Sequence, residues 1–149
     1  MEGISNHDID SILRPACRDY VGVYSANNIP QEIKDKSTFY FVCNLSNRGE
    51  VGSHFVTVLC FTDYVMYIDS LGLPCTNASI SKFLAQLNKP LFFNTTQVQD
   101  FESKYCGYYC ILFVLYYSSK NKPCKLQFTK GNLLLNDKRC IKYITKLLE

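Results

Sequence analysis

The sequence predicts an α+β fold in which a mixed or antiparallel central sheet is flanked by helices. Short runs rich in β-branched and aromatic residues alternate with segments whose apolar residues recur at helical spacing. A length of 149 residues with 47% hydrophobic and 19% charged residues is typical of a globular protein and excludes a disordered or collagen-like chain. Because no repeat or linker-like segment divides the chain, we expect one domain over residues 1–149.

The first half of the chain contains one predicted helix and four predicted strands. Ser5 and Asn6 precede apolar residues at helical spacing, which predicts a capped short helix that ends near Pro15. The polar, glycine-containing segment Ser46–Gly52 predicts a turn. Only Thr62 and Asp63 separate the last two strands, which favours a hairpin. The strands are expected over Tyr20–Tyr24, Thr38–Leu45, His54–Phe61 and Tyr64–Asp69.

The segment between these strands and the next long apolar run adds a helix and a strand. We expect a helix that is capped by Asn77 or Ser79 and continues through Asn88. The segment Leu91–Thr96 predicts a fifth strand, and a polar loop over residues 97–104 follows it.

The last third of the chain predicts two helices. Cys106–Tyr117 is apolar nearly all round and does not alternate, which favours a buried central helix, although its β-branched and aromatic residues leave a strand open. Lys125–Thr129 has no clear pattern. Asn136 is expected to cap a final helix whose apolar face is formed by Ile141, Ile144, Leu147 and Leu148.

The eight cysteines are expected to be free thiols of a soluble, cytosolic protein. Residues 1–30 contain acidic residues and no apolar run, so they do not resemble a secretory signal or a transit peptide. The longest apolar stretch, Tyr108–Tyr117, is about half of a membrane span, and we expect no membrane partner. Most cysteines, such as Cys43 and Cys60, are expected to be small buried residues, with Cys75 the most exposed exception.

A structural metal site is not expected. The chain has no CxxC pair, and its only histidines, His7 and His54, are far apart in the sequence. Cys106 and Cys110 share one helix face, but no second pair of ligands completes a zinc site. The sequence therefore requires no metal and no other cofactor.

Four residues have the types and positions of a cysteine-based acyl-transfer site. His54 begins a strand and Asp69 ends its hairpin partner, so we expect the carboxylate to reach the imidazole and fix its tautomer. Cys106 begins the apolar helix, where the helix dipole and free N–H groups favour a thiolate. Gln99 on the preceding loop can donate an amide N–H to an oxyanion, together with the backbone N–H of Cys106. Gly107 allows a tight turn into the helix and close approach of a substrate.

Each of these residues also has an ordinary structural interpretation. A lone histidine such as His54 is usually a hydrogen-bonded structural residue, and Asp69 can be a turn residue. Cys106 can be a small buried residue, and Gln97 is as well placed as Gln99. The combined order and placement is more specific than any one residue.

Three segments around these residues resemble a known family. They are Gly52–Phe55 (GSHF), Tyr67–Gly72 (YIDSLG) and Cys106–Cys110 (CGYYC), with six residues between Gln99 and the last of these segments. With the N-terminal helix and the segment YVGVY, they make residues 5–118 resemble the adenovirus-type cysteine proteases, or adenains. The clan of this family also contains the proteases of SUMO and other ubiquitin-like proteins. The chain is more similar to the adenain-like proteases of Polinton-type elements and adintoviruses than to those of adenoviruses.

The resemblance implies a papain-like cysteine endopeptidase with a Cys-His-Asp triad. His54 corresponds to the base, Asp69 to its orienting acid, Gln99 to the oxyanion donor and Cys106 to the nucleophile. The implied substrates are viral capsid and core precursor proteins, cut after small residues during virion maturation. The implied location is the nucleus or cytoplasm of a host cell and the virion.

The same resemblance implies activators and a substrate cleft, with some departures from the family. Phe55 stands where the family usually has Trp, and with Gly107 it is expected to line the cleft. Residues 88–96 contain no cysteine that could tether an activating viral peptide through a disulfide, so the implied peptide is non-covalent. The chain is also shorter than the adenovirus enzymes after the cysteine helix. DNA is the second activator that the family implies, and we expect a monomer.

The net charge of +3 is unevenly distributed along the chain. Residues 120–149 contain eight basic and two acidic residues, whereas the preceding 119 residues carry a net charge of −3. The basic segment is either a solvated helix face or a weak, sequence-independent contact with DNA. The candidate DNA contacts are Lys138, Arg139, Lys142 and Lys146.

Two other functions compete with a viral endopeptidase. One is a deconjugating protease for SUMO-type modifiers, which would differ in its substrate. The other is a catalytically inactive virion protein of the same fold that contacts DNA through its basic end. The presence of all four site residues favours an active endopeptidase.

Overall fold

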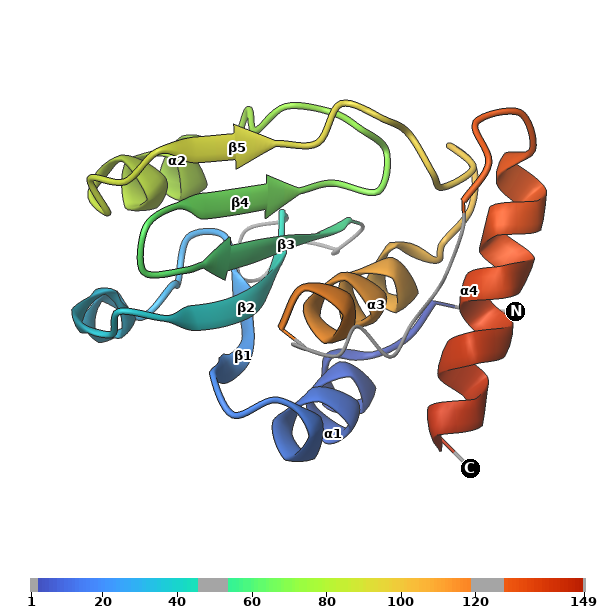
Figure 1. The fold of residues 1–149 in the computed structure, drawn as a ribbon, viewed down its shortest axis with the longest axis horizontal. Coiled ribbons are helices and arrows are strands. Elements are labelled where there is room, and N and C mark those ends of the chain that lie inside the picture. The colour runs from blue at the N-terminus through green and yellow to red at the C-terminus, as the bar shows by residue number, and fades with distance from the viewer. Residues whose placement is uncertain (1–2, 46–53, 119–127, 149) are drawn as a thin grey trace.

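A five-stranded mixed sheet forms the centre of the molecule (Figure 1). The computed structural model describes residues 3–45, 54–118 and 128–148. The strands lie in the order β1-β2-β3-β4-β5; the two outer pairs are parallel and the two inner pairs are antiparallel. This arrangement confirms the predicted α+β fold. The strands are β1 (Tyr20–Ser25), β2 (Phe39–Asn44), β3 (Phe55–Cys60), β4 (Val65–Ile68) and β5 (Leu91–Phe93).

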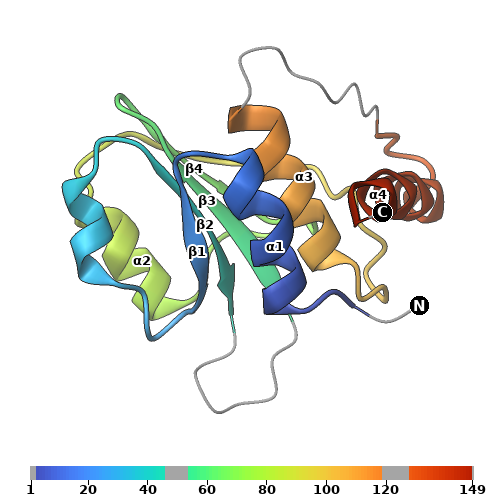
Figure 2. The same ribbon diagram turned by 90° about the horizontal axis from the view of Figure 1, so that it is seen from below.

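Helices cover both faces of this sheet. Helices α1 and α3 lie on one face, and α2 lies on the other with the 3-10 helix η1 (Figure 2). Helix α4 packs on the outer side of α3, away from the sheet (Figures 1 and 2). The helices are α1 (Asn6–Ala16), η1 (Gln31–Asp35), α2 (Ala78–Ala85), α3 (Cys106–Ser118) and α4 (Leu133–Leu148).

Each face of the sheet has its own hydrophobic core. Ile9, Leu59 and Ile111 belong to the core under α1 and α3, whereas Phe41 and Phe83 belong to the core under α2. Full burial of one such side chain contributes roughly 1.5–3 kcal/mol. Because β2 is covered on both faces, five of its six residues are buried, which explains why its sequence is a continuous apolar run.

The predicted buried helix is confirmed as α3, which runs from Cys106 to Ser118. It lies between the sheet and α4, so buried residues occur on every side of it, including Tyr109, Ile111 and Val114. An apolar helix without a polar face is expected only in such a fully enclosed position. The alternative prediction of a strand for this segment, which rested on its β-branched and aromatic residues, is therefore wrong.

The N-terminal helix confirms its prediction, whereas the C-terminal one corrects it. The hydroxyl of Ser5 accepts a hydrogen bond from the Asp8 N–H at 3.1 Å and caps α1, which ends one residue after Pro15. Helix α4 begins at Leu133, and Asn132 caps it, because its side chain accepts from Leu135 N–H at 3.0 Å.

Asn136 is therefore not the cap of α4. It lies in the first turn of the helix, fully buried, and its side chain binds backbone groups of Val98 and Thr129. Both Asn132 and Asn136 are residue types that cap helices well, so the sequence did not distinguish them.

The hairpin that the short Thr62–Asp63 gap predicted is confirmed. Strands β3 and β4 pair antiparallel, and Phe61 N–H donates to Tyr64 O at 2.8 Å across the turn. Strand β5 is shorter than predicted and ends at Phe93. The predicted turn at 46–52 and most of 125–129 lie outside the described residues. No helix in the described parts of the chain has the length and apolar character needed to cross a membrane.

Candidate active site

The hairpin brings His54 and Asp69 together. The ladder of β3 and β4 ends at the pair Thr57–Ile68, so Asp69 follows the last residue of β4 and His54 precedes the first residue of β3. His54 Nε2 lies 2.7 Å from Asp69 Oδ1, as the hairpin register predicted. The carboxylate is almost fully buried, whereas 17% of the His54 side chain is exposed. A reactant can therefore reach the imidazole from outside while its orienting acid is shielded from water.

Cys106 lies on the other side of the imidazole, at the first residue of α3. The His54 ring is hydrogen-bonded to Cys106, and because Nε2 binds Asp69, Nδ1 is the nitrogen that remains for the sulfur. The backbone N–H of Phe55 also points at the sulfur, with N···Sγ of 3.3 Å. The first N–H groups of a helix have no partners within the helix and carry its positive dipole end. This environment stabilises a thiolate.

The electrostatics of the site favour a protonated imidazole. Burial lowers the pKa of His54, but the hydrogen bonds to Asp69 and Cys106 outweigh burial and raise the pKa from 6.5 to about 9. Burial acts in the opposite sense on other thiols: it raises the pKa of Cys43 to about 12 and keeps that of Cys110, one turn after Cys106, well above its ordinary value. Among these three cysteines, only Cys106 touches a cationic group that can stabilise its thiolate.

Asp69 is held in place by its neighbours. Its Oδ1 also accepts from Leu71 N–H at 2.8 Å. Asn94, just after β5, binds both backbone groups of Asp69: its Oδ1 accepts from Asp69 N–H at 2.8 Å, and its Nδ2 donates to Asp69 O at 2.6 Å. The sequence analysis missed Asn94. Its only signal is a polar residue inside a segment that otherwise predicts a strand.

Of the two glutamines in this loop, Gln99 is buried and Gln97 is partly exposed. Gln99 is 1% exposed, its Oε1 accepts from the hydroxyl of Ser70, and its Nε2 donates to Ser103 O at 2.9 Å. Gln97 is only half-buried and donates its own amide to Gln99 O at 3.0 Å. Ser70, which follows Asp69 directly, therefore connects the acid to the loop of the predicted oxyanion donor. The sequence analysis did not single out Ser70.

The structure gives Gly107 a different role from the predicted one. Gly107 does not have a positive φ, so no tight turn at this position requires glycine. A Cβ on Gly107 would lie 2.5 Å from Ile4 Cγ2 and 3.3 Å from Ile9 Cδ1. Glycine is needed because the N-terminal segment packs directly against α3, and Gly107 is buried in that contact. Phe55 is half-buried, packs against the same core, and contributes its backbone N–H to the site.

The candidate DNA contacts lie apart from these residues, on α4. Lys138, Arg139, Lys142 and Lys146 are all exposed, while Cys140 and Ile144 of the same helix are buried in the core. The spacing of the four basic residues places them along one outward-facing side of the helix.

The remaining cysteines match the expected packing. The seven cysteines in the described residues are free thiols, and Cys75 is the one among them that is not buried. Within the same residues, no group of three or more metal-ligating side chains lies close enough to hold an ion. Cys106 is thus distinguished from its neighbours by its position, and not by exposure.

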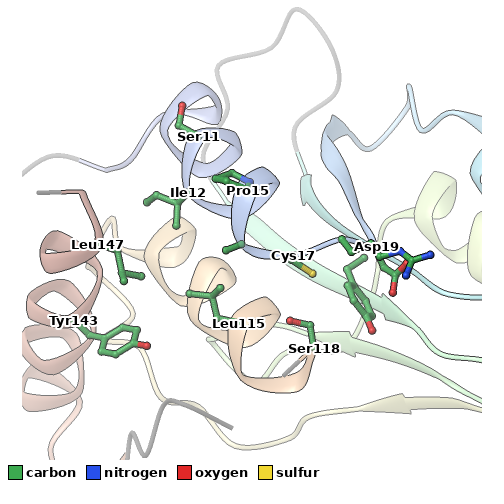
Figure 3. Close-up of a pocket in the computed structure, with 12 residues that line it drawn as sticks. Ser11, Ile12, Pro15, Cys17, Asp19, Leu115, Ser118, Tyr143 and Leu147 are labelled. Carbon is green, nitrogen blue, oxygen red and sulfur yellow. The ribbon is translucent and has the colours of Figure 1, made fainter. Parts of the chain in front are cut away.

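A cavity of about 810 Å³ lies away from the His54–Cys106 pair, between α1, α3 and α4. The side chains of Tyr143 and Leu147 on α4 face Ile12 on α1 and Leu115 on α3 across it (Figure 3). None of the four predicted catalytic residues lines this cavity.

Two solved structures share the fold of this chain. A crystal structure of a protease from African swine fever virus matches with a TM-score of 0.61 and 12% identity, over 98% of this chain and 68% of that chain. The central domain of an uncharacterized Legionella pneumophila protein matches with a TM-score of 0.55 and 12% identity, over 99% of both chains. The sequence matches no protein-family model, and no curated protein sequence is significantly similar to it. The comparisons therefore show that the chain shares its fold with these two proteins, one of which is a viral protease.

Proposed function

We propose that the chain is a cysteine endopeptidase of the adenain type. The observation that carries this proposal is the position of His54, which binds Asp69 through Nε2 and Cys106 through its other nitrogen at the start of α3. Cysteine peptidases need this order of acid, imidazole and thiol. The fold that the chain shares with a viral protease supports the proposal.

The reaction follows from the roles of these groups. The Cys106 thiolate attacks the carbonyl carbon of a peptide bond, and the developing oxyanion accepts hydrogen bonds from Cys106 N–H and the Gln99 amide. The C–N bond breaks as the His54 imidazolium gives its proton to the leaving amine, which leaves a thioester on the sulfur. His54 then takes a proton from water, the hydroxide attacks the thioester, and breakage of the C–S bond releases the acid and restores the thiolate.

The proposed substrates are precursor proteins of a viral capsid or core, processed during virion maturation. The residues that resemble adenains support this choice, as does the viral protease among the structures of similar fold. A deconjugating protease for ubiquitin-like proteins would use the same four residues. An activity-based probe built on a ubiquitin-like protein, compared with precursor-derived peptides, separates the two: labelling by the probe without peptide cleavage favours deconjugation.

The proposal is tested with two cysteine variants. Cys106→Ser should abolish peptide cleavage, because removal of the nucleophile of a triad leaves only a residual rate, roughly 10³-fold or more below the wild type. Cys75→Ser is the matched control, since Cys75 is the cysteine of the described residues that is not buried, and this variant should cleave at the wild-type rate. Cleavage by Cys106→Ser at the rate of the control would contradict the proposal.

DNA as an activator remains a further part of the proposal. The exposed basic side of α4 supports a weak electrostatic contact that does not depend on base sequence. An activating peptide, if one acts, must bind without a disulfide to residues 88–96, because this segment has no cysteine.

A further inference from the structure

The loop that carries Gln99 is hydrogen-bonded to α3 and α4 on both sides of that residue. On the N-terminal side, the Val98 carbonyl accepts from Asn136 Nδ2 at 3.0 Å and from the Tyr109 hydroxyl at 3.2 Å. On the C-terminal side, Asp100 N–H donates to Asp137 Oδ1 at 3.4 Å. The backbone neighbours of Gln99 are thus fixed by residues of α3 and of the first turn of α4.

Tyr109 and Asp137 join these two anchors into one network. The Tyr109 hydroxyl lies 2.7 Å from Asp137 Oδ1 and shares its one proton between this oxygen and the more distant Val98 carbonyl; both side chains are buried, at 0% and 3% exposure. Burial raises the pKa of the Asp137 carboxyl, and the hydrogen bond from Tyr109 opposes this effect. The hydroxyl of Ser103 and the backbone N–H of Asp100, both in the loop that carries Gln99, oppose it as well. The buried carboxyl is therefore bound to this loop on the C-terminal side of Gln99.

The opposite side of the loop is fixed by Ser70, the residue after Asp69. Its carbonyl accepts from Val98 N–H at 2.9 Å and from Gln99 N–H at 3.1 Å, and its hydroxyl binds Gln99 Oε1. With Oε1 directed at Ser70, the orientation of the Gln99 amide is set, and Nε2 is the end that donates. Gln99 is therefore held between the triad-bearing edge of the sheet and the α3–α4 network.

We propose that Tyr109, Asn136 and Asp137 are positioning residues that hold Gln99 as the oxyanion donor. This inference rests on the proposed peptidase function, and it makes α4 part of the catalytic apparatus. It is carried by the three hydrogen bonds to Val98 and Asp100. Because the side chains of these three residues bind Val98, Asp100 and Thr129, their loss should leave the thiolate–imidazolium pair intact.

Tyr109→Phe is the cleanest test, since it removes one hydroxyl and keeps the ring. We expect kcat for a peptide to fall about 10- to 100-fold with little change in KM, because a displaced oxyanion donor weakens binding of the transition state and not of the substrate. Alkylation of Cys106 by iodoacetamide, which needs no oxyanion donor, should stay within twofold of the wild type. The control is Tyr117→Phe on the same helix, where the ring is 39% exposed. Equal kcat for Tyr109→Phe and the control overturns the inference.

Asp137 offers a conservative variant that separates positioning from folding. Asp137→Asn keeps an oxygen that can accept from Tyr109 and Asp100, so it should retain kcat within about threefold, whereas Asp137→Ala should lose it like Tyr109→Phe. If Asp137→Ala does not fold, Tyr109→Phe and Asp137→Asn are compared with each other. A lower kcat for Tyr109→Phe supports the inference, and equal kcat values overturn it.

Hydrogen exchange provides a readout that does not depend on peptidase activity. In Tyr109→Phe, the backbone amides of residues 97–104 should exchange at least severalfold faster than in the wild type and in Tyr117→Phe. Unchanged exchange overturns the inference whether or not the wild-type chain cleaves peptides. If Tyr109→Phe exchanges faster but the wild-type chain cleaves no peptide, the proposed function is overturned and the anchoring of the loop is still supported.

Discussion

The charge on Asp69 should control the protonation of His54, and the substitution Asp69→Asn tests this directly. The wild-type pKa of about 9 is about 2.5 units above the ordinary value of 6.5, although burial alone would lower it. At 1.36 kcal/mol per unit, the surroundings favour the imidazolium by about 3 kcal/mol; this is the net result after burial has been subtracted from the effect of the hydrogen bonds and charges. An opposite charge at this distance shifts a pKa by roughly 1–3 units, so we expect Asp69→Asn to lower the His54 pKa to between about 6 and 8.

The assay is an NMR titration of the two imidazole rings. Asparagine keeps an oxygen within reach of Nε2, so the variant removes charge with little change in shape. His7, on the exposed surface of α1, is the other histidine of the chain, and the variant His7→Gln identifies which resonances belong to His54. The alkaline limb of the peptidase pH profile, where His54 loses the proton that the leaving amine needs, should shift down by the same amount. A wild-type His54 that titrates near 6.5, or an unchanged pKa in Asp69→Asn, would refute the proposed electrostatics.

The same pKa predicts how stability depends on pH. A group whose pKa is raised by folding stabilises the native state while it is protonated in both states, below pH 6.5, and this contribution is lost as the pH rises through about 9. The loss should amount to about 3 kcal/mol. It is measured as the difference in free energy of unfolding by urea between the wild type and His54→Ala, which should decrease from pH 6 to pH 10. A difference that is constant over this range would contradict a raised His54 pKa.

Three further predictions concern single features of the structure. Gln99→Ala should lower kcat about 10²- to 10³-fold in a peptide-cleavage assay while alkylation of the nucleophile continues at the wild-type rate; loss of both would show that Gln99 has only a structural role. Gly107→Ala should lower the free energy of unfolding by about 1–3 kcal/mol in urea, because its Cβ would lie 2.5 Å from Ile4 Cγ2, and an unchanged midpoint would rule out this packing. Duplex DNA should bind with a log–log salt slope of about −3 to −4 if all four basic residues of α4 contact phosphates, and Lys142→Glu with Lys146→Glu should halve that slope; binding that does not depend on salt excludes the contact.

Local patterns in the sequence were sufficient to predict that His54 and Asp69 lie side by side and that Cys106 begins a helix. A two-residue gap between apolar runs implies a hairpin, and a hairpin brings the start of one strand beside the end of the next. That rule alone placed His54 within reach of Asp69, and the long apolar run after Cys106 predicted the helix that begins there. These predictions succeeded because each depends on neighbours in one short stretch of chain.

The support around Gln99 could not be predicted in the same way. Asn136 binds Val98, which lies 38 positions earlier in the chain, and no local pattern records a contact of that length. Its residue type instead suggested a helix cap, a role that Asn132 performs. The requirement for Gly107 was likewise set by Ile4, about a hundred residues away, and not by the backbone conformation at the helix start. The wrong assignments therefore share one cause: the function of each residue depends on a distant contact.

The reactivity of Cys106 relative to the other thiols tests the central proposal most directly. The thiolate is the nucleophilic form of cysteine, and an imidazolium beside the sulfur favours this form. Exposure alone makes the opposite prediction, because Cys75 is only half-buried whereas Cys106 is 4% exposed. With limiting iodoacetamide and mass-spectrometric mapping, we predict that Cys106 is alkylated at least about tenfold faster than Cys75, and that His54→Ala removes the difference. Preferential alkylation of Cys75 in the wild type, or a Cys106 rate that does not change in His54→Ala, would contradict a Cys106–His54 catalytic pair.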